Sequence, residues 1–274
     1  MKMSNKEERY KIGFFDSGIG GLTVLHKALE MMPLEDYIYY ADTENQPYGI
    51  KTKAEVRELV FKAMDFIVSK NVKAIVVACN TATSVAIEDL RKKYDIPIIG
   101  MEPAVKPAVR YTDIENKKVL VTATKLTLKE EKLHNLISAL DSESIVDLLE
   151  LQELVQFAER LDFDETRITK YLENQFKEID LKDYQTLVLG CTHFIFFKDM
   201  IQKLVTKEIS IIDGNEGTIR HLQNILRTKK SLNQGSGKVE FYNSGVIAKE
   251  GKDLERYQIL FRRLEEIEKL SLGY

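Results

Sequence analysis

One pattern occurs twice in the chain, as Ile75-Val76-Val77-Ala78-Cys79-Asn80-Thr81 and again as Leu187-Val188-Leu189-Gly190-Cys191-Thr192-His193. Each copy is a short apolar run typical of a buried strand, followed by a small residue, a cysteine and a polar pair. In an open α/β sheet, ligands bind at the carboxyl ends of the strands. We therefore expect each cysteine to lie at the functional edge of its own sheet, and two such sheets facing each other would bring the thiols together.

The rest of the chain alternates short apolar runs with longer amphipathic stretches, which is typical of an α/β protein with mainly parallel sheets. Helices are expected where apolar residues recur every three or four positions. The predicted strands are 11–15, 36–41, 74–78, 97–100, 118–122, 144–149, 186–189, 210–212 and 239–243. The predicted helices are 53–70, 83–94, 218–229 and 254–269, with 153–179 mostly helical.

A length of 274 residues favours two modest domains over one large one, because single cores stop growing at roughly 250 to 300 residues. Two of the five prolines fall within 101–107, where we expect regular structure to break and the chain to cross between domains. A turn at 213–217 marks the expected return crossing. The prediction is two similar α/β domains, related by a pseudo-twofold axis and closing over a small polar cleft. The first comprises 1–101 plus 212–274, and the second comprises 102–211.

Composition limits the partners of the chain. With 44% hydrophobic and 30% charged residues and a formal net charge of -3, it has no general attraction for nucleic acid or anionic membranes. Residues 1–11 lack the apolar core of a secretory signal, and no apolar run reaches the roughly 18 residues that a membrane helix needs. We expect a cytoplasmic protein with free thiols and a small-molecule substrate.

The stretch Asp16-Ser17-Gly18-Ile19-Gly20-Gly21 forms a turn between the first strand and a helical run from Leu22. It is not a dinucleotide fingerprint, because that motif needs glycine where Thr23 stands, and it lacks the lysine of a P-loop. The turn could hold a substrate carboxylate at the helix N-terminus, or Asp16 could simply cap that helix. Asp16 could also orient an ammonium group or assist a proton transfer.

The two cysteines are best explained together. Each stands just before an expected helix start, where the helix dipole lowers a thiol's pKa. Neither belongs to a C-x2-C cluster, which disfavours a metal or redox site, and a thiol protease would leave one cysteine without a role. Racemisation uses both, since one thiolate removes a proton from carbon and a thiol on the other face returns one. His193 could promote deprotonation of Cys191, and no lysine motif suggests a pyridoxal cofactor.

These motifs resemble those of the glutamate racemase family, within the aspartate/glutamate racemase superfamily, from about Ile12 to about Gly245. The resemblance is carried by the segments 15–24, Pro47-Tyr48-Gly49, 77–83, 102–104, 123–127 and 189–194. It implies a cofactor-independent and metal-free glutamate racemase that supplies D-glutamate for peptidoglycan and often forms a homodimer. The alternatives are a racemase for aspartate, a hydantoin or another small carbon acid, and a non-catalytic amino-acid-binding regulatory protein.

The resemblance also assigns site residues. It implies that Cys79 and Cys191 are the acid/base pair, assisted by Asp16 and His193 respectively, with Glu159 as a further carboxylate near the site. The positions that it implies for binding the substrate, besides Asp16 and His193, are Ser17, Tyr48, Gly49, Asn80, Thr81, Thr124, Thr127 and Thr192. Asn45 differs from the family pattern, which has arginine there.

Overall fold

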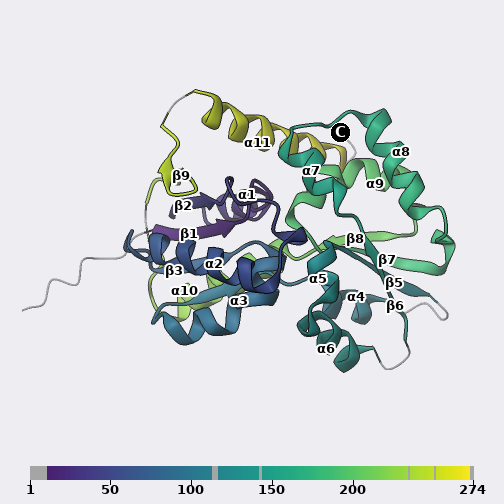
Figure 1. The fold of residues 1–274 in the computed structure, drawn as a ribbon, viewed down its shortest axis with the longest axis horizontal. Coiled ribbons are helices and arrows are strands. Elements are labelled where there is room, and N and C mark those ends of the chain that lie inside the picture. The colour runs from purple at the N-terminus through teal and green to yellow at the C-terminus, as the bar shows by residue number, and fades with distance from the viewer. Residues whose placement is uncertain (1–10, 113–116, 142–143, 234, 250, 272–274) are drawn as a thin grey trace, which may run out of the picture.

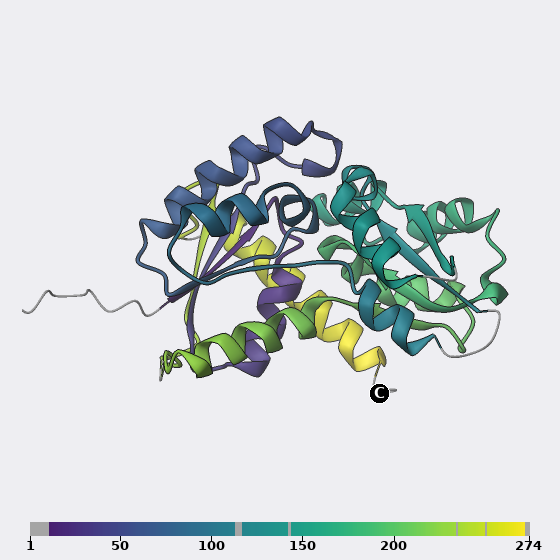
Figure 2. The same cartoon turned by 90° about the horizontal axis from the view of Figure 1, so that it is seen from below.

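The computed structural model describes residues 11–112, 117–141, 144–233, 235–249 and 251–271 (Figure 1). Residues 1–10, most of the stretch examined for a secretory signal, lie outside this part. The described residues form two parallel-rich sheets lying side by side, each covered by helices on both faces, as Figure 2 shows from below. The predicted α/β class with mainly parallel sheets is confirmed.

The first sheet has the order β10-β9-β2-β1-β3-β4, with every neighbouring pair parallel except β9 and β10. Alternate residues of its strands face opposite cores, as the two-residue period of a strand requires. Phe14 and Val76 pack on the side of α1, whereas Phe15 and Val77 pack on the side of α2 and α3. The strands are β1 (Lys11–Asp16), β2 (Asp36–Ala41), β3 (Ala74–Val77), β4 (Ile98–Gly100), β9 (Val239–Asn243) and β10 (Val246–Ile247). The helices around them are α1 (Leu22–Met31), α2 (Lys53–Val68), α3 (Asn80–Lys93), α10 (Asn215–Thr228) and α11 (Lys252–Ser271).

The second sheet has the order β6-β5-β7-β8 and is parallel throughout. Val119, Val121 and Val188 face α4 and α6, while Leu120 and Leu187 belong to a core shared with α7, α8 and α9. The strands are β5 (Lys118–Ala123), β6 (Val146–Glu150), β7 (Tyr184–Leu189) and β8 (Ser210–Asp213). The helices are α4 (Val105–Tyr111), α5 (Lys125–Lys129), α6 (Glu131–Leu140), α7 (Glu153–Glu159), α8 (Glu165–Phe176) and α9 (Lys198–Leu204), and the 3-10 segments of the chain are η1 (Tyr48–Ile50), η2 (Leu181–Asp183) and η3 (Thr192–Phe197).

Each predicted strand is present to within two residues at either end, but the helix predicted at 83–94 already begins at Asn80, as α3. The stretch 153–179 is mostly helical, as predicted, and is divided into α7 and α8 at 160–164, where Leu161 adopts a positive φ of 55°. The predicted turn at 213–217 is already helical from Asn215, whose backbone N–H is accepted by the Asp213 carboxylate at 3.0 Å. Helix α4 begins at Val105, so Pro107 lies in its first turn, where a missing N–H costs no helical hydrogen bond.

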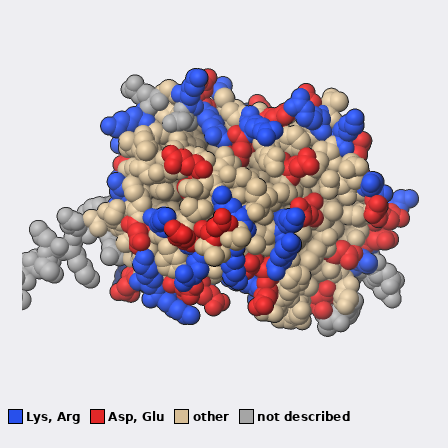
Figure 3. All heavy atoms as spheres, viewed as in Figure 1, with Lys and Arg blue, Asp and Glu red and all other residues tan. Residues whose placement is uncertain are grey.

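The chain leaves the first sheet after β4 and returns after β8, when α10 packs against α1. The domain limits predicted at 101 and 212 stay a prediction. None of the helices in the described residues combines the length and apolar character needed to span a membrane. Basic and acidic side chains are intermingled on the face seen in Figure 3, without a large area of one sign.

Candidate active site

The two cysteines follow β3 and β7, the strands next to β1 and β5 in their respective sheets. Both thiols are free, and the residues are only 6% and 7% exposed. Thr192, next to Cys191, bonds to Asp16, and Ser17, next to Asp16, lies 3.6 Å from the Cys79 sulfur, so the two thiols belong to one site. Two sheets meeting at their carboxyl ends thus enclose two buried thiols, one contributed by each sheet.

Cys79 is the N-cap of α3, and its Sγ accepts a hydrogen bond from the Ala82 backbone N–H at 3.4 Å. The Ser17 hydroxyl lies 3.6 Å from the same sulfur. Burial, and next the charge of Asp16, raise the pKa of the Cys79 thiol to about 12, against the lowering effect of the Ala82 and Ser17 hydrogen bonds. A helix starts directly after Cys79, as expected for that thiol and three residues before the predicted range 83–94, but the lowered thiol pKa expected from this start was wrong for Cys79.

Cys191 has a different partner. Its Sγ lies 3.8 Å from His193 Nδ1, and the other ring nitrogen, Nε2, lies 2.8 Å from Glu159 Oε1. Burial alone would lower the pKa of His193, but the hydrogen bonds and charges of Cys191 and Glu159 outweigh it and raise that pKa well above its ordinary value. This shift favours the protonated imidazolium form of His193, which lies beside the Cys191 sulfur.

Glu159 is held from three sides. Its Oε1 also accepts the Ile19 backbone N–H at 2.9 Å, and its Oε2 accepts Nη2 of Arg256 at 2.5 Å. Burial opposes the charge of this carboxylate, but the His193 and Arg256 contacts outweigh it and lower the pKa of Glu159. Glu159 was expected only from the family resemblance, and the structure places it in direct contact with His193.

Asp16 connects the two halves at the end of β1. Its Oδ1 accepts the Gly18 backbone N–H at 2.9 Å, and its Oδ2 accepts the Thr192 hydroxyl at 3.2 Å from beside Cys191. Burial raises the pKa of Asp16, while the charge of His193 acts against this shift. Of the roles considered for this aspartate, helix capping is not the one seen, since α1 has no side-chain cap.

Three threonine hydroxyls form a closed triangle across the boundary between the halves. Thr81 Oγ1 lies 3.0 Å from both Thr124 Oγ1 and Thr127 Oγ1, which are 2.9 Å from each other. Thr81 lies in the first turn of α3, whereas Thr124 is the N-cap of α5. Gly49 approaches the same place so closely that an added Cβ would lie 2.9 Å from the Thr124 Cβ.

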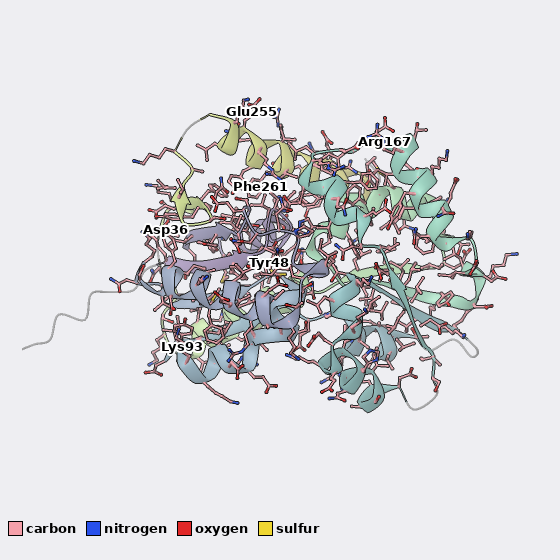
Figure 4. All side chains as sticks on the ribbon, viewed as in Figure 1. Asp36, Tyr48, Lys93, Arg167, Glu255 and Phe261 are labelled. Carbon is pink, nitrogen blue, oxygen red and sulfur yellow. The ribbon has the colours of Figure 1, made fainter. Side chains whose placement is uncertain are left out.

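Tyr48 and Asn80 complete the predicted set. Tyr48, which Figure 4 labels near the junction of the two halves, donates its hydroxyl to Asp42 Oδ2 at 2.5 Å. Asn45, the departure from the family pattern, donates to Oδ1 of the same aspartate at 2.9 Å. Asn80 is buried, and within the described part of the chain its Oδ1 has no hydrogen-bond partner. That oxygen is free to accept a donor from a bound molecule.

Sequence reasoning missed Asp42 and Arg256. Asp42 could have been suspected from its place directly after a predicted strand, but Arg256 is one of many charges on a helix and carries no local signal. A separate cluster of possible metal ligands, His26, Glu30 and Glu268, lies on α1 and α11. Lys27 already forms a salt bridge with Glu30 and lies 3.7 Å from Glu268, so these carboxylates have a cation within the protein.

The chain is similar to known racemases over most of its length. The Asp/Glu/hydantoin racemase family model matches residues 22–222. Glutamate racemase 2 of Bacillus subtilis (strain 168) is 52% identical over 264 residues, covering 96% of this chain and 100% of the relative. Among solved structures, glutamate racemase isoform RacE1 of Bacillus anthracis has a TM-score of 0.76 at 28% identity, covering 98% of this chain and 96% of its own. Glutamate racemase of Francisella tularensis in complex with D-glutamate has a TM-score of 0.78 at 27% identity, with 94% of each chain covered. The chain belongs to the Asp/Glu/hydantoin racemase family and is an amino-acid racemase.

Proposed function

We propose that this chain interconverts L- and D-glutamate by two-base proton transfer, with Cys79 and Cys191 on opposite faces of the substrate and without a cofactor. One observation carries the proposal. Two buried thiols follow corresponding strands of two sheets, and each has its own polar partners, Ser17 for Cys79 and His193 for Cys191. A reaction that needs a proton acceptor on one face and a proton donor on the other uses such a pair.

The proposed step balances as follows. In one direction the Cys191 thiolate takes the α-proton and becomes a thiol, and the carbanion then takes the proton of the Cys79 thiol, which becomes a thiolate. The raised pKa of Cys79 keeps it protonated in the free enzyme, as a proton donor must be. His193, whose pKa is raised, lies 3.8 Å from the Cys191 sulfur and is the group that assists Cys191. The opposite direction starts from the reversed protonation state of the two sulfurs.

The threonine triangle, Asn80 and Ser17 supply hydroxyl and amide groups for the substrate's carboxylates and ammonium. The Thr81, Thr124 and Thr127 hydroxyls now bond to one another, so a carboxylate entering between the halves would replace these contacts. We propose glutamate as the substrate because the similar proteins are glutamate racemases. D-glutamate formed in this way would supply peptidoglycan synthesis.

The test is α-proton exchange in deuterated water, followed for both enantiomers of glutamate and of aspartate. Deuterium should enter either enantiomer of glutamate and appear in both products, with aspartate exchanging far more slowly. If purified enzyme with intact thiols neither racemises glutamate nor exchanges its α-proton, the glutamate assignment fails. Faster exchange of aspartate would change the substrate and leave the thiol pair in place.

A further inference from the structure

The carboxy-terminal helix α11 reaches the site through one side chain. Figure 1 shows α11 running from the edge of the first sheet, near β9, across to α7 of the second half. Arg256, one turn into this helix, donates Nη2 to Glu159 Oε2 at 2.5 Å and to the Glu159 backbone carbonyl at 2.6 Å. The helix is itself held by Tyr257, whose ring stacks on Phe241 of β9 at a centroid distance of 4.5 Å.

We infer that Arg256 is a positioning residue for the reaction: it holds the Glu159 carboxylate charged and aimed at His193, so that the imidazolium beside Cys191 is maintained. The contacts form one continuous chain, Arg256 to Glu159, Glu159 to His193 and His193 to Cys191. Arg256 touches neither thiol. The role of Arg256 rests on the proposed function, because that function is what gives Cys191 its task.

The location of the shared proton explains why the arginine matters. Glu159 and His193 bond through Nε2 and Oε1, and the proton between them can reside on either partner. With the guanidinium on Oε2, the carboxylate stays ionised and the proton stays on the ring. Without that cation the proton shifts toward Glu159, the ring becomes neutral, and the Cys191 thiolate loses its counter-charge.

Other ionisable groups around this chain of contacts do not replace Arg256. Tyr39 of β2 interacts electrostatically with Glu159 and Arg256, and also with Asp16 of β1 and Tyr257 of α11. Asp16 interacts in the same way with His193 and Glu159. Each of these groups is neutral or negative. The positive charges that act most strongly on Glu159 are those of His193 and Arg256.

Arg263 provides a matched control on the same helix. It pairs with Asp199 at 2.5 Å and donates to the Phe196 carbonyl at 3.1 Å, so it also anchors α11 to the second half. It has no contact with Glu159 in the hydrogen bonds and ion pairs of the described residues. Arg263→Gln therefore reports what loosening the helix does without changing the charge on Glu159.

The experiment compares how fast iodoacetamide alkylates Cys191 and Cys79 in substrate-free enzyme at neutral pH, with each cysteine peptide quantified by mass spectrometry. Since the thiolate is the nucleophile, Arg256→Gln should lower the Cys191-to-Cys79 rate ratio at least about threefold. Arg256→Lys should restore most of the ratio, and Arg263→Gln should leave it unchanged. An unchanged ratio in Arg256→Gln, or an equal fall in Arg263→Gln, overturns the inference.

A double-mutant cycle tests whether Arg256 acts through Glu159. In a Glu159→Gln background, adding Arg256→Gln should change the alkylation ratio no further, because the carboxylate is already gone. An additional fall of the same size as in the wild-type background would refute the relay. This pair also serves if Arg256→Gln alone does not fold, since the double variant has no unpaired carboxylate.

The pH profile of kcat/KM supplies the second readout. Losing the cation should move the acid limb of the profile of Arg256→Gln to higher pH by roughly half to one unit, and Arg256→Lys should move it back. A uniform fall in rate at all pH values would mean a merely structural role. Failure of the wild-type enzyme to racemise glutamate would refute the proposed function but not the effect of Arg256 on Cys191, because the alkylation ratio is measured without substrate.

Discussion

Gly20 offers the sharpest test of how closely the two halves pack around Cys191. An added Cβ at Gly20 would lie 2.3 Å from both His193 Nδ1 and Thr192 Oγ1, whereas ordinary contacts begin at 3.4 Å. One or both side chains must therefore move by about 1 Å in Gly20→Ala, which is the scale of misplacement that can cost about 100-fold in rate. The two affected groups are the ones that contact Cys191 and Asp16.

The accompanying loss of stability should be modest. Forcing one methyl group into a packed site costs about 1 to 3 kcal/mol. A loss of about 2 kcal/mol would lower the melting temperature by roughly 4 to 8 °C in a protein of this size class. The assays are racemisation of L-glutamate followed by circular dichroism and thermal melting by calorimetry.

Gly217→Ala is the control, because Gly217 lies in α10 and an added Cβ would meet nothing within 4 Å. This variant should keep wild-type activity and gain about 0.5 to 1 kcal/mol, since alanine stabilises a helix interior relative to glycine. If Gly20→Ala racemises glutamate within about threefold of the wild-type rate, the close packing inferred around His193 is incorrect.

Four further substitutions test other parts of the molecule. Cys79→Ser and Cys191→Ser should each lower racemisation about 100- to 10,000-fold while each still exchanges the α-proton of a single, opposite enantiomer in deuterated water; exchange of both enantiomers by either variant would contradict one thiol per face. Thr81→Val should raise the KM for glutamate severalfold with little change in melting temperature, and an unchanged KM would remove the hydroxyl triangle from substrate binding. Glu35→Gln leaves buried Lys73, 2.5 Å away, without its carboxylate partner and should cost about 3 to 5 kcal/mol in denaturant unfolding with kcat unchanged, whereas a variant as stable as the wild type would show that the pair contributes nothing.

Local sequence predicts the strands well because each is a short apolar run closed by a small or polar residue. The apolar composition of the runs ending at Val77 and Leu189 is enough to predict that they are buried strands. The positions of both cysteines at strand ends follow from this prediction. The predicted helix boundaries are wrong where the same local sequence favours both a turn and a helix start. Asp213-Gly214-Asn215 is favourable for a turn, yet the Asp213 carboxylate accepts the Asn215 N–H and the helix starts at once.

Of the candidate site, the sequence predicts only the residues that stand at the ends of strands. Cys79, Asp16 and Cys191 stand directly at or after strands, so their meeting follows from the topology of parallel sheets. The pKa of Cys79 does not follow from its helix start, because burial and the charge of Asp16 exceed the effect of one capped N–H. Arg256 lies 97 positions from Glu159, and nothing in the residues around it distinguishes it from the other charges of α11.

The hydroxyl triangle and the Asp16–Thr192 bond have a consequence for affinity. In the proposed function, the groups that bind the substrate satisfy one another across the two halves, so each glutamate would first have to displace these internal contacts. The apparent dissociation constant is then the intrinsic one divided by the fraction of molecules that stand open. Such an enzyme binds its substrate less tightly and releases its product more easily. This suits a reaction whose substrate and product differ only in handedness and must leave by the same route.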